Sequence, residues 1–210
     1  GYMNVKYDYA LPTEHVELTE AAHPIPDQQG VEGARRIAEL LDKAGPDDLV
    51  LCLISGGGSA LMTLPVQGVT LEDMKALTDA LLRAGATINE INAIRKHVDR
   101  LKGGKLARLA SPAHVVSLIL SDVVGDPLDV IASGPTVPDT STFGEAYSLL
   151  ERYGLLETVP TSIVEHLRRG KRGEIEETPK PGDALFTTSQ NVVVASNEIA
   201  ARAAAKKAMD

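Results

Sequence analysis

The chain has 210 residues, of which 43% are hydrophobic but only 3% aromatic, so one large domain would build its core mainly from Leu, Ile, Val and Ala. The formal net charge of −8 argues against nucleic-acid binding, and no apolar run approaches the roughly 20 residues of a membrane span. The one cysteine, Cys52, excludes a disulfide framework and a thiolate metal cluster. We therefore expect a cytoplasmic protein with small-molecule partners, without nucleic-acid or membrane partners.

Apolar periodicity and turn residues predict an alternation of strands and helices. In the first half, residues 1–13 show no clear period, and the expected elements are a strand at 15–19, a helix at 31–44, a strand at 49–54 and helices at 70–84, 88–101 and 106–110. In the second half they are a strand at 114–120, helices at 142–153 and 160–170, a surface loop at 171–183, a strand at 191–195 and a helix from 197. This order predicts a three-layer α/β/α sandwich, Rossmann-like, with a mostly parallel sheet.

The segment 48–60 (DLVLCLISGGGSA) is the most informative stretch. An apolar run of strand length ends in Ser55, three consecutive glycines (Gly56, Gly57 and Gly58) and Ser59. Glycine is costly inside a helix or strand but suits a sharp turn that exposes backbone N–H groups to a ligand. Because open α/β sheets bind ligands at such strand ends, this loop is expected to bind an anion, although a tight turn without a ligand is the alternative.

Two further predicted strands also end in polar segments, SDVVGD at 121–126 and ASN at 195–197. The carboxyl ends of parallel strands share one edge, so the three loops should converge. Asp122 and Asp126 could hold Mg²⁺ together with phosphate oxygens, or Asp122 could be the general base for a hydroxyl; capping of local turns is the alternative for both.

Four cations, Arg95, Lys96, Lys102 and Lys105, lie close together in this acidic chain and could meet a phosphate or carboxylate. The alternative for Arg95 is a surface ion pair with Asp99, four residues later. The five histidines show no metal-binding spacing. The sequence also has no GxGxxG dinucleotide fingerprint, no P-loop, and no G-x-S-x-G nucleophile elbow.

Four segments together resemble the glycerate 2-kinase family that carries a C-terminal MOFRL domain: EAAHPIPD (20–27), DLVLCLISGGGSALM (48–62), INEINAIRKHVDRLKGGKLA (88–107) and SLILSDVVGDPLDVIASGPTVPDTSTF (117–143). The resemblance covers about residues 14–200 and implies ATP- and Mg²⁺-dependent phosphorylation of D-glycerate at the 2-hydroxyl. It also implies that residues 1–210 are the N-terminal α/β domain, truncated at both ends. The family's glycine–lysine segment and MOFRL domain would then be missing, and with half of an interdomain active site the chain alone should be inactive.

Carried onto this chain, the resemblance implies an anion site at Ser55, Gly56, Gly57, Gly58 and Ser59. It implies neutralisation of phosphate charge by Arg95, Lys96 and Lys102, and a second group, Ser121, Asp122 and Asp126, that positions Mg²⁺ or the attacking hydroxyl. Asn197, in the third strand-end segment, is a further candidate for binding the substrate or the phosphate. The implied partners are glycerate and a nucleotide, with a homodimer as the candidate assembly.

Two alternatives remain at this point. Some members of the family are labelled hydroxypyruvate reductases, but the missing GxGxxG argues against an NAD(P)H-dependent reductase. A non-catalytic module that binds small anions would use the same loops without needing acids at Asp122 and Asp126, and Mg²⁺-independent binding would favour it.

Overall fold

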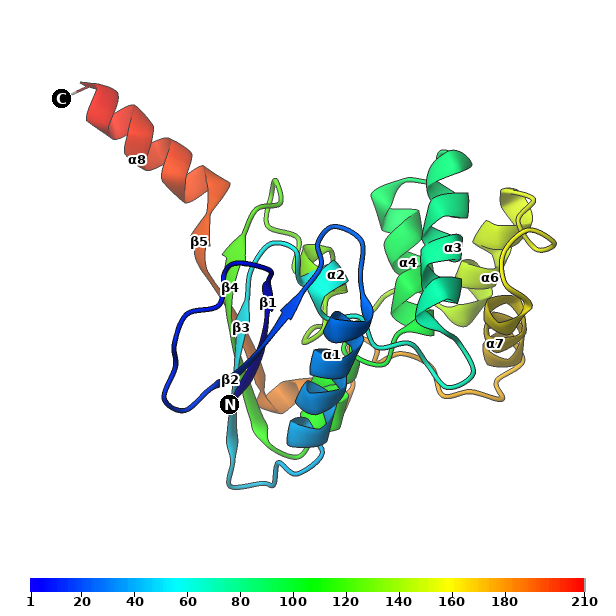
Figure 1. Ribbon diagram of the computed structural model, residues 1–210, viewed down its shortest axis with the longest axis horizontal. Coiled ribbons are helices and arrows are strands. Elements are labelled where there is room, and N and C mark those ends of the chain that lie inside the picture. The colour runs from blue at the N-terminus through cyan, green and yellow to red at the C-terminus, as the bar shows by residue number, and fades with distance from the viewer. Residues whose placement is uncertain (210) are drawn as a thin grey trace.

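The computed structural model describes residues 1–209 as an α/β chain with two parallel sheets (Figure 1). Strands β1 (Tyr2–Lys6) and β2 (Glu17–Ala21) form the smaller sheet. Strands β3 (Leu49–Ile54), β4 (His114–Ser121) and β5 (Ser189–Ser196) form the larger sheet, in the order β3-β4-β5. The α/β class and the parallel sheet expected from the sequence are confirmed.

The described residues also form eight α-helices: α1 (Gln28–Leu41), α2 (Gly58–Leu61), α3 (Leu71–Arg83), α4 (Ile88–Val98), α5 (Lys105–Ala110), α6 (Phe143–Arg152), α7 (Thr161–Lys171) and α8 (Asn197–Met209). Short 3₁₀ turns lie at Ile131–Ser133 and Ala184–Thr188. Thr70, Thr87 and Thr142 each form a capping box at a helix start, which satisfies backbone N–H groups that have no partner inside the helix. In the described part of the chain, none of the helices is both long and apolar enough to cross a membrane.

The N-terminal elements differ from the sequence expectation. Strand β1 falls where no period is visible, because its five residues are defined by pairing with β2 and not by a local pattern. Strand β2 begins two residues after the expected start. Helix α1 begins three residues early, because the Asp27 side chain accepts a hydrogen bond from the Gly30 N–H at 2.9 Å and caps the helix before its apolar stripe begins.

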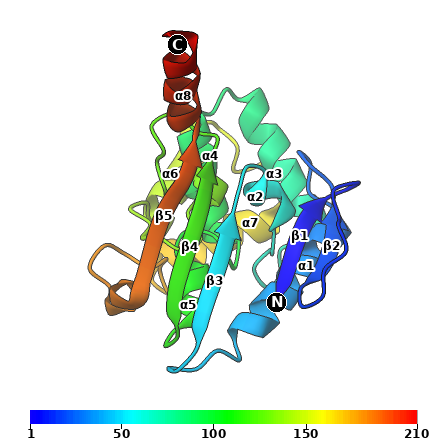
Figure 2. The ribbon, with the colours of Figure 1, turned by 90° about the vertical axis from the view of Figure 1, so that its left-hand side faces the viewer.

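Helices cover one face of the larger sheet (Figure 2). Along β3 the side chains alternate, so that Val50, Cys52 and Ile54 are partly buried while the leucines between them are exposed. Burial raises the pKa of the Cys52 thiol to about 11, so the thiolate is not available at neutral pH. On the opposite face, the exposed apolar side chains are Leu49, Leu51, Leu53, Leu120, Val192 and Val194. Within residues 1–209 this face has no cover, although the uniformly apolar sequence of β3 predicts burial on both sides.

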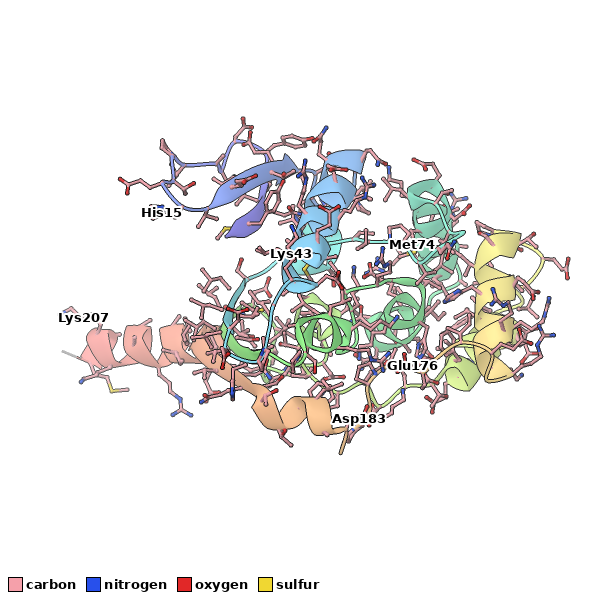
Figure 3. All side chains as sticks on the ribbon, turned by 90° about the horizontal axis from the view of Figure 1, so that it is seen from below. His15, Lys43, Met74, Glu176, Asp183 and Lys207 are labelled. Carbon is pink, nitrogen blue, oxygen red and sulfur yellow. The ribbon has the colours of Figure 1, made fainter. Side chains whose placement is uncertain are left out.

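Helices α3, α4, α6 and α7 pack around an apolar core of their own beside the larger sheet (Figure 1). Its fully buried side chains include Leu77, Leu81, Ile94, Leu150, Ile163 and Leu167. Helix α8 extends away from the rest of the chain, with Lys207 near its end (Figure 3), and its side chains are exposed. Residues of α3 and α4 line a common cavity with the segments that follow β3 and β4, so these helices face the carboxyl ends of the two strands.

Candidate functional site

A cavity of about 770 Å³ lies between the carboxyl ends of β3 and β4 and helices α3 and α4. The loop at 55–59 lines it from β3, and Asp122 lines it from β4. Arg95 of α4 and Lys102 after α4 also line it, together with Lys75 and Asp79 of α3 and the segment at 23–26. The position agrees with the general rule that α/β sheets bind ligands at the carboxyl edge of their strands.

Each glycine of the loop stands where a side chain would collide with a neighbour. A Cβ on Gly56 would overlap the carboxylate of Asp122, and one on Gly58 would lie 2.8 Å from the Cβ of Ala132. Gly57 has φ +86°, and its Cβ would lie 3.0 Å from the His23 ring. The three glycines therefore allow this loop to approach three other segments, which explains their presence more fully than the turn alone.

The hydroxyl of Ser59 is held by a short polar chain. Its Oγ lies 2.6 Å from Ser133 Oγ, which in turn donates to Asn92 Oδ1 at 3.1 Å. Because the Ser133 hydroxyl has one hydrogen and gives it to Asn92, Ser59 is the donor in the first bond. Ala132 and Ser133 have φ of 50° and 61°, a strained backbone region for non-glycine residues. The Gly103 N–H donates to the Ser133 carbonyl at 3.0 Å and helps to hold this strained segment in place.

Of the cations that line the cavity, Arg95 and Lys102 have N–H groups that are free to bind a ligand. Lys102 is only 1% exposed, and its Nζ donates to Asp99 Oδ2 at 2.6 Å and to the Met62 carbonyl at 2.9 Å, so within residues 1–209 its third N–H has no acceptor. Arg95 makes one long side-chain hydrogen bond, 3.4 Å from Nη2 to Thr78 Oγ1. Burial lowers the pKa of both groups, with the nearby Asp99 carboxylate opposing it. An anion in the cavity would offset the cost of burying these charges.

The surface ion pair considered for Arg95 is not formed in the described chain. Asp99 is completely buried, and its carboxylate accepts hydrogen bonds from the backbone N–H groups of Leu64 at 3.0 Å and Leu101 at 2.8 Å as well as from the Lys102 ammonium group. Asp99 is thus the counter-ion of Lys102, and the guanidinium group of Arg95 is left for a ligand.

Of the two aspartates predicted to bind Mg²⁺, one lines the cavity and the other does not. Asp122 lines the cavity, whereas Asp126 has φ 52° and is not part of the cavity wall. Residues 1–209 contain no group of three His, Cys, Asp or Glu side chains suited to a metal ion. A second carboxylate, Asp79 of α3, also lines the cavity but is paired with Arg83 at 2.9 Å. Mg²⁺ commonly binds through one or two carboxylates plus phosphate oxygens, so Asp122 fits a magnesium ion that is bound together with a phosphate group.

The other two strand-end residues are close to this site but outside its wall. Ser121 is buried, and its Oγ accepts a hydrogen bond from the Val123 N–H at 3.3 Å, within its own turn. Asn197 Nδ2 donates to the carbonyl of Asp122 at 3.0 Å, and the Ser196 hydroxyl accepts from the Ile199 N–H at 3.3 Å. The three strand-end loops therefore do converge, with Asn197 supporting the backbone of Asp122.

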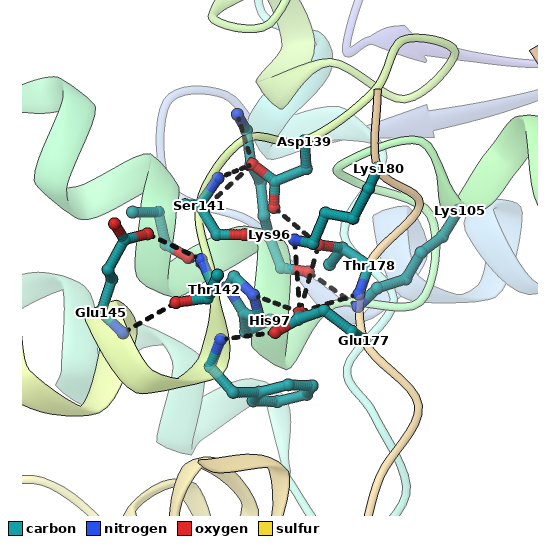
Figure 4. Close-up of polar contacts among 12 residues, drawn as sticks. Lys96, His97, Lys105, Asp139, Ser141, Thr142, Glu145, Glu177, Thr178 and Lys180 are labelled. Atoms are coloured by element: carbon teal, nitrogen blue, oxygen red, sulfur yellow. Dashed lines mark hydrogen bonds and ion pairs between the residues drawn. The ribbon is translucent and has the colours of Figure 1, made fainter. Parts of the chain in front are cut away.

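Lys96 does not line the cavity in which it was predicted to neutralise phosphate charge. Its ammonium group lies 3.3 Å from Asp139 and 3.7 Å from Asp129, and its side chain is 6% exposed and outside the cavity wall (Figure 4). Neighbouring residues of an α-helix point about 100° apart, and the side chain of Lys96 is directed toward Asp129 and Asp139 and not toward the cavity that Arg95 lines. Lys96 instead joins α4 to the segment that precedes α6.

Glu177 connects several segments through hydrogen bonds to its carboxylate. The sequence did not predict this role, because Glu177 lies in a segment that was expected to be a surface loop. Its carboxylate accepts hydrogen bonds from His97 Nε2 at 2.9 Å and from the backbone N–H groups of Phe143 at 2.9 Å and Thr178 at 2.8 Å (Figure 4). Burial alone would raise the pKa of this carboxyl, but these hydrogen bonds lower it to about 2. Glu177 therefore joins helices α4 and α6 to the chain before β5.

We expect Glu177→Gln to lower the stability of the protein near neutral pH by about 1–2 kcal/mol, discounted because the side chain is partly exposed. The folded-state pKa is depressed, so the contribution is present above the ordinary carboxyl value and is lost as pH falls toward 2. Urea unfolding at pH 7, 4 and 3 measures it, with Glu176→Gln at the neighbouring exposed residue as the control. Equal wild-type and Glu177→Gln stabilities at pH 7 would contradict this role.

Comparisons with known proteins place the chain in a family. Residues 1–168 match the family model described as "Domain of unknown function (DUF4147)". A Pyrococcus horikoshii protein named glycerate 2-kinase is 47% identical over 208 residues, which covers 99% of this chain and 46% of that protein. An Agrobacterium vitis protein named putative hydroxypyruvate reductase is 44% identical over 210 residues, covering 100% of the chain and 46% of that protein.

A solved structure of a Pyrococcus horikoshii protein has the same fold. It superposes with a TM-score of 0.92 at 46% identity, and the match covers 100% of this chain and 47% of that structure. The chain thus spans about half the length of the relatives that it matches.

Proposed function

Because the chain belongs to the DUF4147 family, a domain family without an assigned function, we propose a function from its cavity and its named relatives: ATP- and Mg²⁺-dependent phosphorylation of D-glycerate to 2-phosphoglycerate. In this proposal the chain supplies the N-terminal α/β domain of a longer cytoplasmic enzyme. The observation that carries it is the cavity, in which the glycine loop, the cations Arg95 and Lys102 and the Asp122 carboxylate face the same space. Phosphoryl transfer depends mostly on positioning and charge neutralisation, and these groups provide both.

The residues of the cavity can be assigned to the two anionic groups of the reaction, the carboxylate of glycerate and the transferred phosphate. The planar guanidinium group of Arg95 suits bidentate binding of the glycerate carboxylate. Lys102 acts as a point charge toward a phosphate group, together with the backbone N–H groups of the loop at 55–59. Asp122 would accept the proton of the attacking hydroxyl or bind Mg²⁺, which when bound neutralises charge on the phosphate oxygens.

A paired assay on the longest product of the parent gene tests this proposal. One reaction contains D-glycerate, ATP and Mg²⁺, with ADP release coupled to an optical signal. The other contains hydroxypyruvate and NADH and is followed by the loss of nicotinamide absorbance. We expect ADP release that requires glycerate, and its absence would refute the kinase proposal.

The second reaction addresses the reductase name carried by the Agrobacterium vitis relative. The missing GxGxxG fingerprint argues against dinucleotide binding by this chain. Oxidation of NADH without glycerate-dependent ADP release would replace the kinase proposal with the reductase. If neither reaction occurs but glycerate binds without Mg²⁺, the cavity belongs to a non-catalytic binding module.

A further inference from the structure

A second, smaller cavity of about 240 Å³ lies at the carboxyl end of α4, where it meets α5, α6 and α7. Its wall has no residue in common with the larger cavity. Basic side chains make up half of its lining: His97, Arg100, Lys105, Arg108 and His166. Glu176 is the one acidic residue in the wall, so in this acidic protein the cavity is locally positive.

The positive charge in this basic pocket is poorly neutralised by the protein. Lys105 Nζ donates to two backbone carbonyls, of Lys96 at 2.7 Å and Asp99 at 2.6 Å, and makes no ion pair with any residue from 1 to 209. The Lys105 pKa is lowered to about 8, mainly by burial and in part by Arg108, with nearby carboxylates opposing this. A buried ammonium group held only by neutral acceptors retains much of its desolvation cost.

The two arginines are also available to a ligand. Arg100 is exposed and has no ion-pair partner among the described residues. Arg108 donates from Nη2 to the Glu177 carbonyl at 2.8 Å, and its Nη1 lies 3.4 Å from the Glu176 carboxylate. The Glu176 side chain is 78% exposed, so this ion pair is weak and an anion could displace it.

The shape of the pocket limits the ligand. Its volume suits one small group, and its remaining wall is apolar, formed by Val66, Leu109, Phe143 and Ile175. Two arginines and a lysine around a small space are the donors that recognise a phosphate dianion. We propose that this pocket binds the phosphate group of inorganic phosphate or of a small phosphomonoester, at a site separate from the larger cavity.

Isothermal titration of the full-length protein with inorganic phosphate, at constant ionic strength, tests the site. We expect saturable binding that weakens by about tenfold or more in the Arg100→Gln/Arg108→Gln double variant. Arg35→Gln on α1, which removes an exposed arginine paired with Glu32, should bind phosphate like the wild type. Arg108→Lys keeps the charge and should retain part of the affinity, which separates loss of a ligand contact from loss of folding.

Binding in the larger cavity is distinguished with Arg95→Gln, because inorganic phosphate alone in that cavity would contact the free donors of both Arg95 and Lys102. Our proposal requires that this variant still bind phosphate with unchanged affinity, whether or not the protein proves to be a kinase. Phosphate binding that Arg95→Gln abolishes, or that the double variant leaves unchanged, would overturn it. A parallel titration with glycerol 2-phosphate shows whether the pocket prefers a phosphomonoester or inorganic phosphate. Binding of either ligand that depends on Arg100 and Arg108 supports the site, and binding of neither ligand overturns it.

Discussion

Replacing Asp99 by asparagine should destabilise the protein by about 3–5 kcal/mol, the usual effect of removing one partner of a buried ion pair. Asp99 is completely buried, and its carboxylate lies 2.6 Å from the ammonium group of Lys102, which is itself 1% exposed. Asp99→Asn keeps the size of the side chain but leaves that ammonium group without its counter-charge. It also places an amide N–H₂ near the backbone N–H groups of Leu64 and Leu101, which now donate to the carboxylate.

Urea unfolding followed by circular dichroism measures this effect, with Asp79→Asn as the matched control because Asp79 forms an exposed pair with Arg83 on α3. The double variant Asp99→Asn/Lys102→Met should recover part of the lost stability, since no charge is then buried alone. A double variant as unstable as Asp99→Asn itself would show that Asp99 acts through its backbone hydrogen bonds and not through the lysine charge.

Two helix starts were predicted correctly, because capping is local chemistry. Thr70 and Thr142 each begin a helix where the sequence places one, and β3 has the predicted bounds of 49–54. Strand β1 could not be found in this way, because its only support is pairing with β2. Exposure of one face of β3 could not be found either, because LVLCLI is apolar at every position and carries no alternation.

The candidate site was predictable where topology alone brings residues together. Parallel strands place the ends of β3, β4 and β5 at one edge, so the meeting of the glycine loop, Asp122 and Asn197 follows from the strand order. The basic cluster was only partly informative. Arg95 and Lys102 reach the cavity, but Lys96 turns away toward Asp139, a residue 43 positions later in the chain.

The supporting residues were not predictable, because each depends on contacts between distant segments. His23 lies against Gly57, and Ser133 connects Ser59 to Asn92 through a strained backbone. Glu177 lies in a charged segment rich in glycine and proline, which has the composition of a surface loop. Its carboxylate nevertheless accepts a hydrogen bond from His97 of α4. Local sequence patterns give no signal for such long-range hydrogen bonds.

Asp122→Asn in the full-length enzyme should reduce kcat by about 10²–10⁴-fold, the range expected when a general base is removed. Asparagine has nearly the same shape as aspartate, so the close approach of Gly56 is preserved and only the charge is lost. Glycerate-dependent ADP release at saturating D-glycerate and ATP measures the effect. A magnesium titration separates the two roles: added Mg²⁺ restores part of the activity if Asp122 binds the metal, and has little effect if Asp122 accepts the proton.

Asp126→Asn is the matched control, because it removes the same charge from the same loop but outside the cavity wall. Asparagine tolerates the left-handed backbone of residue 126, where φ is 52°, so the loop should keep its conformation. We expect a much smaller loss of turnover than for Asp122→Asn. Turnover of the Asp122→Asn variant at the wild-type rate would remove Asp122 from the mechanism, and a larger loss in Asp126→Asn would move the magnesium site to that residue. The pair of variants therefore decides which of the two predicted carboxylates serves the reaction.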